Sequence, residues 1–162
     1  MYELLRISDH HFQWFKNKLC HRKNDKPALF TCNSFFWYKK GKMHRDDDRP
    51  ACVFQIHNIK NEIHSFYKNG VRYDIKENDF SKEYYNSRGK LSSIKGKPSV
   101  IYKNGTKEWR LNGCLHRIKL PAVEYANGDK EWWVCGKRHR SDGPAVVIGN
   151  KQFWFEHGVF QK

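Results

Sequence analysis

The chain has 162 residues, with 31 Lys and Arg against 17 Asp and Glu and a formal net charge of +14. This length suits one domain with a core of its own, and the charge favours anionic partners such as nucleic acid, acidic protein surfaces or anionic lipid. The 25 aromatic residues exclude a disordered chain, no apolar run is long enough to span a membrane, and the first residues lack the pattern of a signal peptide.

An internal repeat organises the chain after a short N-terminal segment. Residues 1–13 precede the first tryptophan and are predicted to form an N-terminal cap or arm. An aromatic residue then recurs every 19–29 residues and is followed four residues later by a turn position. This spacing predicts one repeat domain of about seven units over residues 14–160, followed by a tail at 161–162. The aromatic positions are Trp14, Trp37, Phe66, Tyr85, Trp109, Trp132 and Trp154.

The units with the fullest pattern share further positions behind the aromatic residue. Seven residues on comes His, which is followed directly by Arg, and after twelve or thirteen residues comes Pro, which is followed by a small residue. The positions are His21, His44, His116 and His139, and Pro27, Pro50, Pro98, Pro121 and Pro144. Because these positions recur once per unit, we interpret them, together with the tryptophans, as residues that hold the repeat together.

The two central units keep less of the pattern. The unit from Phe66 has Tyr73 where His is expected, and the unit from Tyr85 has Ser92 there. Between them, residues 74–82 are polar and without periodicity, which predicts a loop or short insertion between two better-formed halves.

Each unit has the local pattern of a β-hairpin. In residues 121–136, apolar and polar side chains alternate up to Asn127-Gly128, a pair typical of a type I′ turn, and Asn104-Gly105 repeats this one unit earlier. Further turns are predicted at the glycines after each aromatic position: Gly41, Gly70, Gly89, Gly113, Gly136 and Gly158. The fold class predicted is all-β, an elongated single-layer antiparallel sheet of stacked hairpins of about 23 residues, with a core rich in rings.

The repeat resembles the MORN repeat, a hairpin of similar length with an aromatic strand and a G-x-x-H-G turn. Gly136-Lys137-Arg138-His139 matches that turn, but Arg follows His here in all four His-bearing units, and the Pro-Ala step comes next. The segment 139–145, HRSDGPA, is the fullest copy of this variant, which is frequent in proteins of giant DNA viruses. The resemblance covers roughly residues 14–160. It implies a MORN-like solenoid that serves as a scaffold or interaction module, since such proteins are mostly non-catalytic.

The four His-Arg pairs could instead bind a metal or cleave phosphodiesters. Equivalent positions in successive hairpins lie along a sheet and do not surround one point, whereas a zinc site needs four ligands within about 2.3 Å of one ion. We therefore expect no catalytic residue, no metal and no other cofactor. The imidazole is expected to stabilise a turn by a hydrogen bond, with Arg paired to a carboxylate such as Asp142 or Asp46. The run Asp46-Asp47-Asp48 is interpreted as a solvated loop.

The five cysteines show no C-x-x-C spacing and are odd in number. They are interpreted as reduced thiols, mostly small buried side chains, which predicts an intracellular reducing compartment.

Residues 82–119 carry ten basic side chains against two acidic ones, with tyrosines and a tryptophan between them. Lysines interleaved with rings on a sheet are typical of single-stranded nucleic-acid binding, although a sheet with two wet faces also needs charge for solubility. The candidate contacts with anions or nucleic acid are Lys90, Lys95, Lys97, Lys103, Lys107 and Arg110.

These observations leave two leading hypotheses. The first is a non-catalytic structural or protein-interaction repeat protein that meets acidic protein surfaces, for example those of capsid proteins, as a minor capsid component or other part of the virion of a large DNA virus. The alternative is a basic nucleic-acid-binding module. Attachment to an anionic membrane lacks a basic amphipathic helix or a lipidation signal, and no enzyme motif is present.

Overall fold

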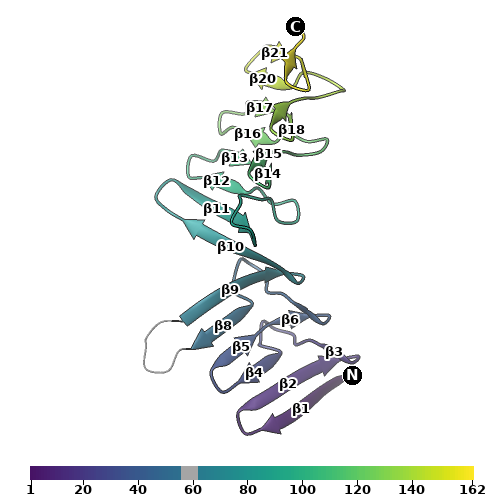
Figure 1. Ribbon diagram of the computed structural model, residues 1–162, viewed down its shortest axis with the longest axis vertical. Helices are drawn as coiled ribbons and strands as arrows, with labels where there is room; N and C mark the ends of the chain where they lie inside the picture. The colour runs from purple at the N-terminus through teal and green to yellow at the C-terminus, as the bar shows by residue number, and fades with distance from the viewer. Residues whose placement is uncertain (56–61) are drawn as a thin grey trace. The chain divides into compact units, whose positions relative to one another are not determined.

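The structure is a computed structural model that describes residues 1–55 and 62–162, and these residues form strands and turns without a helix (Figure 1). The prediction of an all-β fold of antiparallel hairpins is confirmed. The chain divides into two compact units, Met1–Tyr73 and Asp74–Lys162, and the boundary falls inside one strand. No helix that could cross a membrane is present among the described residues.

The first unit contains one antiparallel sheet whose strands follow one another in chain order, β1-β2-β4-β5-β8-β9-β10. A short strand, β3, pairs with β2, and β6 and β7 form a separate two-stranded ribbon. The strands are β1 (Tyr2–Ser8), β2 (His11–Lys16), β3 (Leu19–Cys20), β4 (Leu29–Thr31), β5 (Ser34–Phe36), β6 (Tyr38–Lys39), β7 (Lys42–Met43), β8 (Cys52–Gln55), β9 (Glu62–Lys68) and β10 (Val71–Glu77), which ends in the second unit.

The second unit repeats the plan with the order β11-β12-β13-β16-β17-β20-β21 and the ribbons β14-β15, β18-β19 and β22-β23. Its strands are β11 (Ser81–Asn86), β12 (Val100–Tyr102), β13 (Lys107–Glu108), β14 (Arg110–Leu111), β15 (Cys114–Leu115), β16 (Val123–Glu124), β17 (Lys130–Glu131), β18 (Trp133–Val134), β19 (Lys137–Arg138), β20 (Val146–Ile148), β21 (Lys151–Phe153), β22 (Phe155–Glu156) and β23 (Val159–Phe160). Trp37, Trp109, Trp132 and Trp154 each stand between a strand of the sheet and a ribbon, as Trp132 does between β17 and β18, whereas Trp14 lies within β2.

Three segments lie outside the full repeat pattern, and the predicted loop at 74–82 differs from its prediction because strands occupy most of it. Residues 1–13 hold β1 and the start of β2, which pair as an ordinary hairpin at the edge of the sheet. Residues 74–82 are the end of β10 and the start of β11, and the turn between them is closed by Asn78, whose side-chain oxygen accepts the backbone N–H of Ser81 at 2.9 Å. The tail is also held, because the Gln161 N–H donates to the Trp154 carbonyl at 2.8 Å.

Two kinds of turn alternate along the chain. Those after the aromatic positions have two residues with positive φ, as at Cys135 (48°) and Gly136 (77°), and are type I′. The hairpins at Asn104-Gly105 and Asn127-Gly128 differ from the prediction, because only the glycine of each pair has positive φ. In the second of them, Gly128 N–H donates to the Tyr125 carbonyl at 3.0 Å, and Tyr125 N–H donates to the Asp129 carbonyl. This is a three-residue loop with a glycine bulge.

The turn at Gly89 also has three residues, because Gly89 N–H donates to the Asn86 carbonyl at 2.9 Å. The extra residue shifts the repeat register by one. Tyr84, not Tyr85, makes the backbone bonds that the tryptophans make elsewhere, since its N–H donates to the Ser99 carbonyl and its carbonyl accepts the Ser92 N–H.

The small residue behind each proline is the most deeply buried position of the repeat, and among the rings Tyr73, Tyr84 and Trp109 are buried. The small residues are 0% exposed, and the tryptophans other than Trp109 are only half-buried. The backbone explains this burial: Trp109 N–H donates to the Ala122 carbonyl at 2.8 Å, and Ala122 N–H donates to the Glu131 carbonyl at 2.8 Å. A small side chain lets three strands approach at this point. The residues are Ala28, Ala51, Ser99, Ala122 and Ala145.

Tyr73, which replaces the expected histidine, is 1% exposed and packs its ring 5.8 Å from that of Phe66. Burial raises the pKa of Tyr73 to about 12, with the Asp48 and Asp46 carboxylates adding to the rise. The neutral phenol is therefore favoured in the folded state. Its contribution to the free energy of unfolding is complete below pH 10 and is lost as the pH rises toward 12. We expect the free energy of unfolding to fall by up to about 2 kcal/mol over this range. Denaturant titrations from pH 9 to 11.5 should show a shallower fall in Tyr73→Phe than in the exposed control Tyr2→Phe.

Candidate functional site

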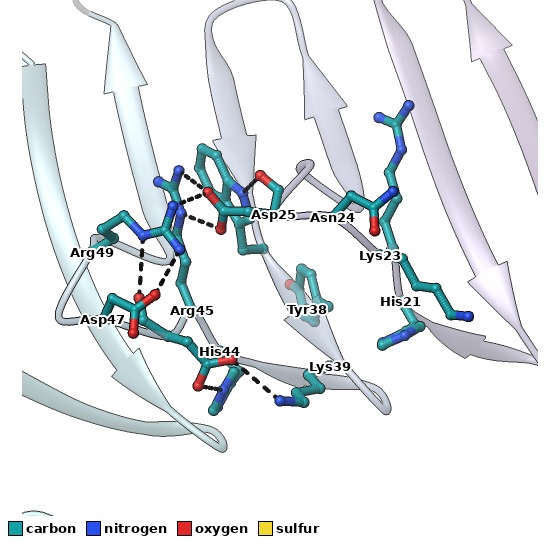
Figure 2. Close-up of a pocket in the computed structure, with 13 residues that line it drawn as sticks. His21, Lys23, Asn24, Asp25, Tyr38, Lys39, His44, Arg45, Asp47 and Arg49 are labelled. Carbon is teal, nitrogen blue, oxygen red and sulfur yellow. Dashed lines mark hydrogen bonds and ion pairs between the residues drawn. The ribbon is translucent and has the colours of Figure 1, made fainter.

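The segments that run from each His-Arg pair to the Pro-Ala step form loops, here called the His-Arg loops. Two pairs of successive loops enclose clefts. The first cleft lies between loops 21–27 and 44–50 (Figure 2). Its volume is about 440 Å³, and Trp37 is one of the residues that line it. The second cleft lies between loops 116–121 and 139–144, has a volume of about 680 Å³ and is lined by Trp132.

Each histidine of the repeat joins its own hairpin to the next one. The imidazole Nδ1 accepts a backbone N–H from the type I′ turn of the following unit, so the proton of the neutral ring sits on Nε2. The imidazole was expected to act on a turn, and it does so as the acceptor and on the neighbouring hairpin. The donor–acceptor distances are 3.3 Å for Lys40 to His21, 3.0 Å for Asn69 to His44, 3.1 Å for Cys135 to His116 and 3.3 Å for His157 to His139.

Each arginine of the repeat covers the tryptophan of its own unit. The guanidinium carbon lies above the indole ring, and a guanidinium N–H donates a hydrogen bond to the carbonyl of the following proline, for example from Arg117 Nη1 to Pro121 at 3.1 Å. Cation–π contacts of this kind contribute about 0.5–2 kcal/mol each. The carbon-to-centroid distances are 3.8 Å for Arg22 on Trp14, 3.8 Å for Arg45 on Trp37, 3.7 Å for Arg117 on Trp109 and 4.1 Å for Arg140 on Trp132.

The carboxylate partners agree with expectation in one loop and differ in another. Arg140 pairs with Asp142 at 2.9 Å. Arg45, however, pairs with Asp25 of the preceding loop, at 2.8 Å from Nη2 and 2.9 Å from Nε. Hydrogen bonds from Arg45 hold the pKa of Asp25 below its ordinary value.

Asp46 binds other side chains of the first unit. Its carboxylate accepts from Lys68 at 2.7 Å, His44 Nε2 at 2.9 Å and Lys39 at 3.2 Å. The hydrogen bond from Lys68 and then that from His44 hold the pKa of Asp46 far below its ordinary value. The aspartate run is thus partly an ion-pair network and not only a solvated loop.

The indole N–H groups show a difference between the two clefts. Trp37 Nε1 donates to the Asp25 carbonyl at 2.9 Å, and Trp109 Nε1 donates to the Gly96 carbonyl at 2.8 Å. Both acceptors lie in loops with four residues between the His-Arg position and Pro, whereas the loop before Trp132 has three. Trp132 Nε1 is buried and has no hydrogen-bond partner among the described residues.

This difference leads to a prediction about paired substitutions. Trp37→Phe and Trp132→Phe both replace a half-buried indole that carries an arginine by a smaller ring. Only the first breaks a hydrogen bond, whereas the second removes a buried N–H that has no partner among the described residues. We expect Trp37→Phe to lower the free energy of unfolding by about 1–2 kcal/mol more than Trp132→Phe does. Chemical denaturation of both variants measures this, and equal losses would contradict the assignment of the unpaired N–H.

A row of glutamates in the second unit was missed from the sequence. Glu108 and Glu131 alternate with valines across β12, β13, β16 and β17 and share the buried face of the sheet. Glu131 accepts from Trp133 Nε1 at 2.7 Å, from the Tyr125 hydroxyl at 3.0 Å and from Arg138 Nε at 3.3 Å. Burial, and then the Glu131 charge, raises the pKa of Tyr125 to about 12.

The sequence does carry a signal for this row, because both glutamates come directly before a repeat tryptophan. Glu108 is bound in the same way, by Arg110 at 2.8 Å and by the Tyr102 hydroxyl at 3.2 Å. Because arginine, tyrosine and tryptophan side chains bind these carboxylates, we assign the two glutamates a structural role inside the sheet.

The predicted anion contacts do not form one cluster. Lys95 and Lys97 precede β12, whereas Lys103 follows it in the hairpin turn, so they stand at opposite ends of that strand. Lys90 is exposed in the turn after β11, and Lys107 is exposed on β13. Arg110 differs from the prediction, because its guanidinium is bound to Glu108 and to the Gly113 carbonyl at 2.8 Å.

The cysteines are free thiols, and Cys52 is buried while Cys32, Cys114 and Cys135 are exposed. The expectation of mostly buried thiols therefore holds for Cys52 alone among these four. Within residues 1–55 and 62–162, no group of three or more His, Cys, Asp or Glu side chains is arranged to hold a metal ion.

Comparisons with protein-family models, curated proteins and solved structures found no significant match. The resemblance to the MORN repeat therefore stays a prediction from the sequence.

Proposed function

We propose that the protein is a non-catalytic repeat protein that binds other proteins. The observation that carries the proposal is the repeated use of His and Arg. The same imidazole contact and the same arginine stack recur in four hairpins, so these residues serve the scaffold and not a reacting centre. What a scaffold of this kind offers is a series of clefts and a strongly basic surface, which fit acidic protein partners.

A peptide-display selection on the immobilised chain in about 150 mM salt tests this proposal. We expect a recurring acidic sequence to be enriched and to bind the chain again as a synthetic peptide. Selection without a recurring sequence would contradict a protein-interaction function.

The setting that we propose, a minor capsid or other virion component, rests on the resemblance of the H-R-x-D-G-P-A segment to repeats frequent in proteins of giant DNA viruses. Mass spectrometry of purified particles of the encoding virus tests it. We expect the chain to copurify with the particles, and its absence from them would contradict a virion role.

Nucleic-acid binding is the second candidate, and the exposed lysines of the second unit favour it. Against it, two of the four interleaved rings, Tyr84 and Trp109, are buried, and the half-buried Tyr85 and Tyr102 are held through their hydroxyl groups by glutamates. Fluorescence anisotropy of labelled DNA and RNA from about 50 to 300 mM salt discriminates the two functions. We expect binding to be lost by about 150 mM, as for non-specific electrostatic contact. Tight binding above that salt, weakened by charge reversal at Lys95, Lys97 and Lys103, would favour nucleic acid.

A further inference from the structure

The first cleft shows how this fold uses one aspartate. Asp25 reaches from its loop to the next unit, where its carboxylate binds Nε and Nη2 of Arg45 and its main-chain carbonyl accepts the indole N–H of Trp37 (Figure 2). One residue thus satisfies two groups of the next unit, the guanidinium of Arg45, which lies on the indole of Trp37, and the N–H of that indole.

The second cleft presents the same two groups without that residue. Arg140 lies 4.1 Å from the Trp132 ring, as Arg45 lies 3.8 Å from Trp37. The preceding loop, 116–121, is one residue shorter and has no aspartate, and the cleft is larger, about 680 Å³ against about 440 Å³. Trp132 Nε1 has no partner among the described residues. Buried polar groups are rarely left unpaired in proteins, so an unpaired donor here calls for an explanation.

Arg140 can accept a new carboxylate at small cost. Its ion pair is with Asp142 of its own loop, whose side chain is 79% exposed. Exposed pairs of this kind contribute little to stability, so exchange of one carboxylate for another is nearly balanced. Lys119, exposed in the short loop and lining the same cleft, adds a positive charge beside it.

We propose that the second cleft binds an aspartate-bearing segment of a partner protein, which takes the place that Asp25 takes in the first cleft. The partner carboxylate pairs with Arg140, and a main-chain carbonyl of the same segment accepts the N–H of Trp132. The net charge of +14 favours approach of an acidic partner. A nucleic-acid phosphate would meet Arg140 but brings no neighbouring amide carbonyl for the indole. This inference rests on the proposed protein-interaction function and names the partner chemistry of one cleft.

The test uses the full ¹⁵N-labelled chain and two capped peptides, Gly-Asn-Asp-Gly and Gly-Asn-Asn-Gly. The Asn-Asp pair copies residues 24 and 25 of the first cleft. We expect the Asp peptide to shift the indole N–H resonance of Trp132 with a Kd on the order of 1 mM, and the Asn peptide to bind at least about tenfold more weakly. Equal effects of the two peptides, or shifts that leave Trp132 unchanged, would overturn the proposal.

Sequence variants distinguish binding at the second cleft from non-specific attraction to the positive charge of the chain. Arg140→Gln should abolish the Trp132 shift, whereas Arg22→Gln, which removes the same charge outside the second cleft, should leave it unchanged. Insertion of Asp between Lys119 and Leu120 restores the longer loop and should block the peptide, while insertion of Gly there supplies a carbonyl without a carboxylate. We expect the Gly insertion to shift the Trp132 indole N–H resonance in the absence of peptide. Arg140 should still bind the Asp peptide in this variant, but weakly. Peptide binding that survives the Asp insertion would place the site elsewhere.

The two proposals fail in different ways. Display selection that yields binding peptides without effect on Trp132 would refute the second cleft as the site and leave the protein-interaction function standing. Selection that yields no peptide, together with no shift from the Asp peptide, would refute both.

Discussion

Glu131→Ala is expected to lower the free energy of unfolding by about 2–4 kcal/mol. The Glu131 side chain is 7% exposed and accepts hydrogen bonds from Tyr125, Trp133 and Arg138. Its removal leaves two neutral donors and a half-buried guanidinium without their acceptor, and each unpaired group costs its desolvation. Urea denaturation followed by tryptophan fluorescence measures the loss.

Glu124→Ala is the matched control. Glu124 lies on the neighbouring strand but on the opposite face of the sheet, pairs with Arg117 at 2.9 Å and is 37% exposed. A single ion pair whose carboxylate remains in contact with water contributes about 1 kcal/mol or less, so the control should lose no more than that. Similar losses in the two variants would mean that the glutamate row is not a buried polar network.

Ala122→Leu is expected to destabilise the protein by about 2–3 kcal/mol. Ala122 is 0% exposed, and its backbone bonds to the strands on both sides leave no room for a longer side chain to move aside. The three added carbons must displace a strand or adopt a strained rotamer.

The effect of Ala122→Leu should be compared with that of Ala126→Leu, an exposed position four residues on in the hairpin loop. We expect a change below about 0.5 kcal/mol there. A thermal denaturation series that ranks the two variants equally would contradict the assignment of the post-proline residue to the core.

The repeat pattern predicted the class of fold because hairpin chemistry is local. Alternation and glycine-containing turns indicate antiparallel strands whatever the neighbours are, and the structure has them. Turn length was harder to predict. Asn127-Gly128 fits either a two-residue turn or the last two positions of a three-residue loop, and backbone hydrogen bonding decides between them. The same uncertainty at Gly89 explains why the sequence pattern indicated Tyr85 as the aromatic position, whereas the structure has Tyr84 there.

The candidate site was predictable only in part for a related reason. His21 and Arg22 were assigned to the scaffold from their recurrence. Arg22 contacts Trp14 of its own unit, but His21 contacts the turn of the next hairpin, and the pattern of a single unit does not contain that partner. Asp25 lies in one loop and serves the next, so its role depends on loop length as much as on residue type. For the same reason, the sequence pattern did not predict the difference between the two clefts.

The contact from histidine to the next turn has a consequence for solvent exchange. A type I′ turn normally leaves its first amide open to water, but the amides of Asn69 and Cys135 are bound by an imidazole of the preceding hairpin. Each such amide can exchange its hydrogen only when two hairpins separate, even though the turn itself is exposed. Asn112 occupies the same place behind Ser92, which has no imidazole to accept its N–H, so we expect faster exchange there. The hydrogen-exchange rate of each such turn amide therefore measures how often the two hairpins at that junction separate.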